Sequence, residues 1–276
     1  MSQAATASTP PAPALATAAE RPPSVAVRAR DVLACEWTKF RAVRSTYWTL
    51  LVAAATPIGF SAFIAFALSS AAKGPAPDPL LPGLLSLEYA VLAVSVLGVL
   101  TFSSEYSTGL IRTTFAAVPR RRVVLAAKAA VTGAVTLAVG EVVAFVSFFA
   151  AQAVLHRHHQ GVSLSHPGVP GAVLADGILL CVCALLGVAL GAIIRHTAGG
   201  IAAAIAVIVL PSLTIVLPAP WNDRIGRFTL VEAARQVTVL HPGTTLFAPA
   251  ISLLVLLAWP AAALLAAALL ITRRDT

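Results

Sequence analysis

Long runs of apolar residues alternate with short polar segments along most of this chain. The apolar runs are long enough to cross the roughly 30 Å hydrocarbon core of a bilayer, which takes about 20 helical residues. This pattern predicts an all-α integral membrane protein with six transmembrane helices in one domain over residues 30–276. The expected spans are residues 47–72, 84–102, 123–155, 171–194, 197–217 and 246–271.

Two further helices are expected on the cytoplasmic side. Over residues 30–44, Leu33, Trp37 and Phe40 recur on one side, whereas Lys39 lies on the other side and Arg41 follows. This spacing favours an N-terminal helix in the membrane interface, with Trp37 at headgroup level. A simple extension of the first span into the cytoplasm is the alternative.

The second expected helix lies between the second and third spans, from Phe102 to Val118. Ile111, Phe115 and Val118 share one face of it, and the opposite face carries polar residues, namely Glu105, Gly109 and Arg112. Pro119 should end this helix before Arg120, Arg121 and Arg122. The apolar stripe could fit a groove on a soluble partner, or the segment could be a loop that reverses the chain on the membrane surface.

Composition supports the membrane assignment. The chain is 58% hydrophobic and 11% charged, with a mean hydropathy of +0.88, whereas soluble domains have about 25% charged residues. The net charge of +8 does not indicate nucleic-acid binding, because the basic residues lie beside the ends of apolar runs. Residues 1–29 are rich in Ala, Pro and Thr, and we expect a disordered cytoplasmic tail rather than a signal peptide.

The distribution of basic residues predicts the orientation. With both termini in the cytoplasm, cytoplasmic and near-cytoplasmic segments hold 14 Lys and Arg residues and external segments hold five, as the positive-inside rule requires. Lys128 should extend back to the cytoplasmic headgroups. Arg outnumbers Lys 16 to 3 and Ala is abundant, which is typical of high-GC bacteria. We therefore expect a bacterial inner (plasma) membrane.

Three carboxylates lie within apolar runs, at Glu88, Glu141 and Asp176. An ionised side chain at the bilayer centre costs at least about 2.5 kcal/mol, so each should face the bundle interior, water or a partner. One hypothesis is that Glu141, with Glu88 and Asp176, lines an outward-facing cavity for a cationic or zwitterionic cargo. The alternative is that each is protonated or hydrogen-bonded between helices and has a packing role only.

Catalytic and metal-binding patterns are absent. The sequence has no GxxxxGK[ST] loop for ATP, no GxSxG and no HExxH. The external loop carries His156, His158, His159 and His166 without cysteine or carboxylate neighbours at ligand spacing, so we expect a solvated loop and no metal site. Cys35, Cys181 and Cys183 imply no disulfide framework.

Two stretches resemble the permeases of type-2 ABC exporters, and the similarity extends over about residues 32–274. The first is the string EWTKFR from Glu36 to Arg41, followed by RSTYW, which is similar to the entry to the first span. The second is the order Glu105, Gly109, Arg112, Pro119, arginine cluster, Lys128, which is similar to the cytoplasmic segment after the second span.

The resemblance implies a function. This chain would be the membrane-spanning permease subunit of an ATP-driven export complex, not an enzyme, and would bind no cofactor. ATP and Mg²⁺ would bind a separate ATPase, and a second permease copy or homologue would complete the pathway in the lipid bilayer. The segment after the second span would be the coupling helix, and its ATPase-coupling residues would be Glu105, Gly109, Arg112, Phe115, Pro119, Arg120 and Arg121. The resemblance also implies an outer lid over residues 218–244.

Two other functions remain open on the sequence. The chain could be a membrane sensor or immunity-type protein that binds an antimicrobial or a lipid without moving it. A membrane enzyme that uses the histidine loop or Glu141 is the third possibility. An ATPase that co-purifies with the chain would favour the exporter.

Overall fold

A computed structural model describes residues 28–71, 78–218, 220–238 and 247–273 of the chain. Every regular element in these ranges is helical, and five helices are long and apolar enough to cross a membrane. These five are α2 (Arg44–Ala71), α3 (Leu81–Ser107), α5 (Arg121–Leu155), α6 (Val169–Ile194) and α10 (Pro249–Arg273). The all-α, multi-pass membrane class predicted from the apolar runs is therefore confirmed. The predicted tail at residues 1–29 lies almost wholly outside the described residues.

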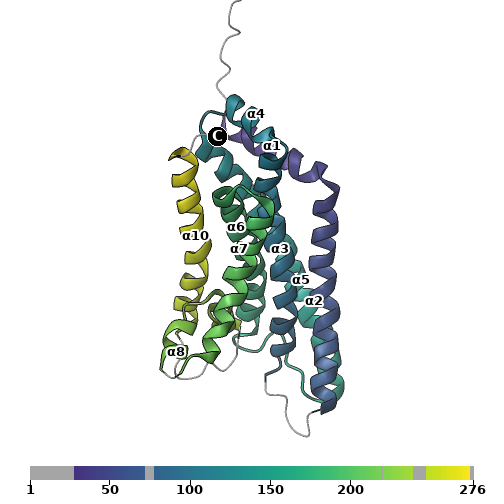
Figure 1. Ribbon diagram of the computed structural model, residues 1–276. Coiled ribbons are helices and arrows are strands. Elements are labelled where there is room, and N and C mark those ends of the chain that lie inside the picture. Colours follow the sequence, from purple (N-terminus) through teal and green to yellow (C-terminus); the bar gives the residue numbers. More distant parts are fainter. Residues whose placement is uncertain (1–27, 72–77, 219, 239–246, 274–276) are drawn as a thin grey trace, which may run out of the picture.

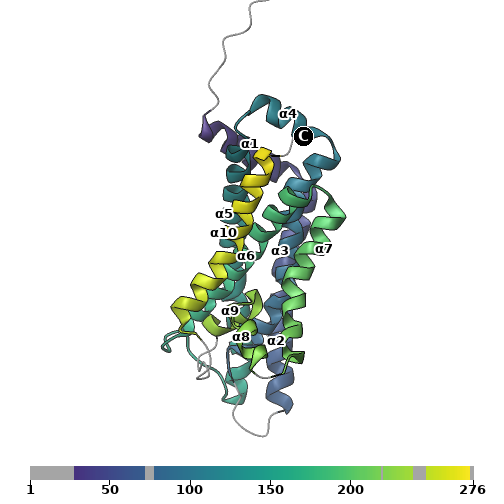
Figure 2. The ribbon, with the colours of Figure 1, turned by 60° about the vertical axis from the view of Figure 1, so that its left-hand side comes forward.

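The long helices run side by side as one bundle (Figure 1). Two short helices, α1 (Ala29–Ala42) and α4 (Leu110–Ala117), lie at one end of the bundle, and α8 (Trp221–Gly226) lies at the opposite end. Figure 2 shows the same separation of α4 from α8 and α9 (Leu230–Thr238) after rotation. We name these the α4 end and the α8 end.

Helices α3 and α6 approach each other closely. Gly98 of α3 lies against the backbone of α6, where a Cβ atom would overlap the carbonyl oxygen of Ala184. Gly187 of α6 lies equally close to the carbonyl oxygen of Ser95. Small residues let two helix backbones approach in a membrane, where association depends on packing rather than on hydrophobic burial. Val94, Leu180 and other buried apolar side chains surround this contact.

Helix α1 is separate from the first span. It ends at Ala42, Val43 is extended (φ −88°, ψ 109°), and α2 begins at Arg44. In Figure 1, α1 lies across the end of the bundle instead of continuing α2. The alternative in which residues 30–44 simply lengthen the first span is therefore wrong. Trp37 is exposed, and Lys39 and Phe40 are half-buried.

The run at residues 197–217 differs from the single long helix that its hydropathy predicts. Its α-helical part, α7 (Thr197–Val209), is followed by a 3₁₀ helix, η2 (Leu210–Val216). Pro211 has no N–H group to continue the α-helical hydrogen bonds, so the chain tightens into the 3₁₀ form there. This run is therefore not one of the five long helices.

Within the segment of the expected outer lid, α9 is largely buried in the bundle. In α9, Leu230, Ala233 and Ala234 are buried, and the helix packs against α6 and α10. Gln236 accepts hydrogen bonds from Ser252 Oγ (2.8 Å) and Phe247 N (3.3 Å), which ties α9 to the start of α10.

Candidate functional site

The turn between α3 and α5 is built from two helices rather than one. The continuous helix expected from Phe102 to Val118 is wrong, because α3 ends at Ser107 and Gly109 adopts the left-handed conformation (φ 74°, ψ −2°) before α4 begins. A residue with a Cβ atom is strained at this φ, so glycine is the natural residue at the break. Pro119 and Arg120 then separate α4 from α5, as expected from the proline.

The inner face of α4 is anchored by apolar side chains. Ile111 and Phe115 are buried, and Val118 is half-buried beside them, so the predicted apolar stripe is confirmed. The guanidinium of Arg121 lies 5.2 Å from the centre of the Phe115 ring, and it donates a hydrogen bond to the carbonyl oxygen of Ile271 (3.2 Å). Arg121 of α5 therefore contacts both α4 and α10.

The outer face of α4 is open. Leu110, Arg112, Thr113 and Ala116 are exposed, as is Arg120 just beyond the helix. Beside this face is an open hollow of about 500 Å³ that Tyr106, Arg112 and Arg195 help to line. Arg195 belongs to the turn between α6 and α7, and its guanidinium lies 5.3 Å from the centre of the Tyr106 ring. The α4 end thus presents a short helix and an adjacent hollow to the space outside the bundle.

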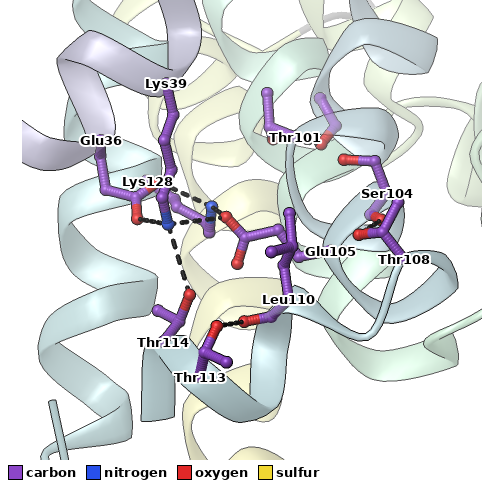
Figure 3. Close-up of polar contacts among 11 residues, drawn as sticks. Glu36, Lys39, Thr101, Ser104, Glu105, Thr108, Leu110, Thr113, Thr114 and Lys128 are labelled. Carbon is purple, nitrogen blue, oxygen red and sulfur yellow. Dashed lines mark hydrogen bonds and ion pairs between the residues drawn. The ribbon is translucent and has the colours of Figure 1, made fainter. Parts of the chain in front are cut away.

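Beneath α4, four charged side chains form a compact cluster. We call Glu36, Lys39, Glu105 and Lys128 the charge cluster. Figure 3 shows them converging from α1, α3 and α5. Lys128 Nζ donates to Glu36 Oε2 (2.6 Å) and to Glu105 Oε1 (2.7 Å). Lys39 Nζ donates to Glu36 Oε1 and to Glu105 Oε1, both at 2.9 Å, and to Thr114 Oγ1 of α4 at 3.4 Å.

The charge cluster is largely withdrawn from water. The side chains of Glu36, Glu105 and Lys128 are 5%, 8% and 4% exposed. Removing an ion from water costs several kcal/mol, and the cost is offset only when each charge has well-placed partners of opposite sign. Two carboxylates and two ammonium groups provide such partners here. The expectation that Lys128 extends to the headgroups is wrong, because a buried pair of carboxylates lies within its reach.

Lys39 is the most exposed member of the cluster. Burial lowers its pKa, but the hydrogen bonds that it donates to Glu105 and Glu36 outweigh burial, so its pKa lies above the ordinary value of 10.5. A raised lysine pKa adds stability that is fully present below the unfolded-state pKa and is lost as pH rises through the folded-state pKa. Lys39 therefore stays charged and paired throughout the neutral range.

The three intramembrane carboxylates do not form one site. Glu88 is exposed on α3, close to α9, whereas Asp176 is buried and lines a small cavity with Ser147 and Gln152. Glu141 lies against Gly177, where a Cβ atom would be 2.5 Å from its carboxyl carbon. Glu141 and Asp176 are thus neighbours across α5 and α6, while Glu88 lies elsewhere. Glu141 Oε2, Asp176 Oδ1 and Ser147 Oγ have no hydrogen-bond partner within the described residues.

The histidine loop shows no metal-binding arrangement. His156, His158, His159 and His166 are exposed. Within the ranges that the structure describes, no group of three or more His, Cys, Asp or Glu side chains could hold a metal ion. Cys35, Cys181 and Cys183 are free thiols.

Two members of the charge cluster, Glu36 and Lys128, were not recognised as partners from the sequence. Glu36 lies three residues before Lys39, which is the spacing of a helical ion pair. Lys128 lies inside an apolar run, where a charge needs a partner at the same depth. Together these signals point to a carboxylate at the depth of Lys128, and Glu36 and Glu105 are acids at this end of the bundle.

Comparison with known proteins adds no family assignment. No protein-family model matches the sequence, and no curated protein matches it significantly.

Proposed function

We propose that this chain is the membrane-spanning permease subunit of an ABC exporter, coupled through α4 to a separate ATPase. The observation that carries the proposal is the charge cluster beneath α4. Its ion pairs join α1, α3 and α5 to one another, and α4 is tied to it through the hydrogen bond from Lys39 Nζ to Thr114 Oγ1 (3.4 Å). Glu105 lies two residues before the end of α3 and Lys128 lies in the third turn of α5, so a push on α4 would be transmitted to both spans.

The exposed face of α4 suits a soluble partner. Leu110 is 56% exposed and would fit an apolar groove, while Arg112 and Arg120 would reach acidic groups around it. In this proposal ATP and Mg²⁺ bind the partner, and this chain supplies the pathway.

The proposal includes six crossings and an orientation. Helix α7 rises about 20 Å over 13 residues, and η2 adds about 14 Å over seven, which together match the hydrocarbon thickness. Basic side chains favour a cytoplasmic α4 end, because Arg41, Arg112, Arg120, Arg122 and Arg273 lie there. Both termini would then be cytoplasmic, in the inner membrane of a bacterium.

A second permease copy or homologue would complete the pathway. Exposed apolar side chains cover the outer faces of α2 and α10, including Phe63 and Phe66 on α2 and Leu254 and Leu265 on α10. Such faces contact either lipid or another helical subunit.

Co-expression with a candidate ATPase tests the proposal. The Arg112→Ala variant should keep its fold, because Arg112 is exposed. It should stimulate ATP hydrolysis by the ATPase at least about tenfold less than the wild-type permease does. Arg157→Ala is the matched control, because Arg157 is also exposed but lies just beyond Leu155, at the end of α5 that is far from α4. Failure of any ATPase to co-purify, or a reporter tag at Thr113 that proves external, would contradict the exporter. Ligand binding without transport would then favour the sensor or immunity-type function.

A further inference from the structure

A groove of about 370 Å³ lies between α1, the start of α2, α3 and α5. Its walls are mainly apolar and include Phe40, Val43, Leu97, Leu100 and Val131. One end of the groove is polar, because Glu36, Lys39, Glu105 and Lys128 line it as well. The groove therefore has an extended apolar part and a charged end, which is the shape of a site for an amphiphile.

One atom at the charged end lacks a partner. Glu105 Oε1 accepts hydrogen bonds from both lysines, but Glu105 Oε2 has no hydrogen-bond partner among the described residues. Figure 3 shows the Oε1 contacts and no dashed line to the second oxygen. Glu105 is 6% exposed, so bulk water does not readily supply the missing donor. A buried acceptor without a donor costs about 1–3 kcal/mol, and more when it is charged.

The charges around Glu105 Oε2 limit the chemical class of ligand that can bind there. The charge cluster holds two carboxylates and two ammonium groups, so it is formally neutral and provides no excess positive charge for an anion. The three N–H groups of Lys39 are occupied by Glu36, Glu105 and Thr114. The group that the site lacks is therefore a hydrogen-bond donor, and the best donor for a carboxylate is an ammonium group.

The groove lies at the depth where lipid headgroups are found. Trp37 on α1 and Tyr47 and Trp48 on α2 are 44%, 54% and 67% exposed, and they flank the α1–α2 junction that forms one wall. Exposed Trp and Tyr side chains mark the interface between hydrocarbon and headgroups. A lipid of the leaflet at the α4 end could thus enter the groove from the side.

We propose that this groove binds phosphatidylethanolamine, with the primary ammonium donating to Glu105 Oε2 and an acyl chain against Leu97, Leu100 and Val131. A phosphatidylcholine headgroup has the same charge but no N–H donor, so it cannot satisfy Glu105. An anionic headgroup would approach an unpaired carboxylate oxygen unfavourably. The proposal rests on the membrane location of the bundle and on this groove, and it does not depend on an ATPase.

Competition between two lipids tests the proposal on the purified full chain. Phosphatidylethanolamine and phosphatidylcholine with identical acyl chains are supplied in equal amounts in detergent, and native mass spectrometry counts the bound molecules. We expect phosphatidylethanolamine to bind about tenfold more tightly, since a hydrogen bond to a charged group contributes about 1.5–3 kcal/mol. Equal binding of the two lipids, or tighter binding of phosphatidylglycerol, would overturn the proposal.

Two serines on α3 provide matched variants. Ser104 lines the groove and Ser107, one turn later, does not, although both are exposed. Ser104→Phe should abolish lipid retention by filling the groove, whereas Ser107→Phe should retain it. If Ser104→Phe fails to fold by size-exclusion chromatography, Thr49→Phe fills the groove from α2.

The headgroup contact has its own variant. Glu105→Gln should reduce the preference for phosphatidylethanolamine over phosphatidylcholine to about one while leaving chain binding intact. Retention of the preference in Glu105→Gln would contradict the site, and so would retention of lipid in the groove-filling variant that folds. If Ser104→Phe shifts the chain from dimer to monomer and wild type carries no lipid, a second copy of the chain occupies the groove and the proposal is wrong.

Discussion

Lys128 Nζ lies 2.7 Å from Glu105 Oε1, and this contact joins the start of α5 to the end of α3 inside the bundle. Both side chains are more than nine-tenths buried. The chain between them leaves the bundle, forms α4 and returns. The ion pair therefore closes this loop at its base, so that the two spans flanking α4 are linked to each other by a short polar contact as well as by the chain.

Removing the charge of Lys128 should destabilise the protein strongly. Lys128→Met leaves two carboxylates with Lys39 alone, and breaking a buried pair by removing one partner costs about 3–5 kcal/mol. We expect a clear fall in the thermal unfolding midpoint of the purified protein in detergent.

A second substitution provides the control for this prediction. Glu36→Gln in the Lys128→Met background removes one uncompensated carboxylate, so it should restore part of the lost stability. If the losses of Lys128→Met and Glu36→Gln alone simply add in the double variant, Glu36 and Lys128 are not energetically coupled.

Gly109 should be needed for its backbone conformation rather than for space. A Cβ atom there would contact nothing within 4 Å, but φ is 74°. Gly109→Val should therefore lower the unfolding free energy by about 1–2 kcal/mol. Asn tolerates the left-handed region, so Gly109→Asn should be milder. Thermal unfolding of the two variants side by side is the measurement, and equal losses would contradict the backbone explanation.

Much of the membrane architecture could be predicted from hydropathy. The runs that contain α2, α3, α5, α6 and α10 are long and nearly free of charge. Such runs can be recognised as candidate spans without knowledge of the tertiary structure. The structure of the run that forms α7 and η2 is harder to predict, because one proline changes the helix type without changing the hydropathy. The break at Gly109 could not be seen in the sequence because Glu105, Gly109 and Arg112 keep the helical spacing across it.

The candidate site could be predicted only in part. The apolar face of α4 follows from spacing alone, and the structure buries Ile111 and Phe115 as predicted. The pairing of Lys128 with Glu36 joins residues 92 positions apart. Helical periodicity cannot bring α1 against α5, so it could not identify this pair. The separation of Glu88 from Asp176 likewise depends on how α3 and α6 face each other.

Close packing of α3 and α6 should depend on Gly187. Gly187→Val would force atoms into the backbone of α3 near Ser95, and overpacking of this kind costs about 1–3 kcal/mol. Gly171 is in the same helix with nothing within 4 Å of a Cβ atom, so Gly171→Val should lower the unfolding midpoint much less. Similar unfolding midpoints for the two variants in detergent would show that the tight approach does not contribute to stability.

Glu141 and Asp176 provide a test of the cargo pathway, and Glu88 provides its control. Because Glu141 and Asp176 are neighbours across α5 and α6 while Glu88 lies apart, a carboxylate pathway would involve the first two alone. With a cationic cargo, we expect Glu141→Gln to reduce export at least about tenfold, because the amide removes a negative charge from the low-dielectric interior, where such a charge binds a cation strongly. Glu88→Gln should leave export unchanged. Export is measured in cells at matched protein levels. Unchanged export in Glu141→Gln would contradict a carboxylate pathway, and Glu141 and Asp176 would then have a packing role only.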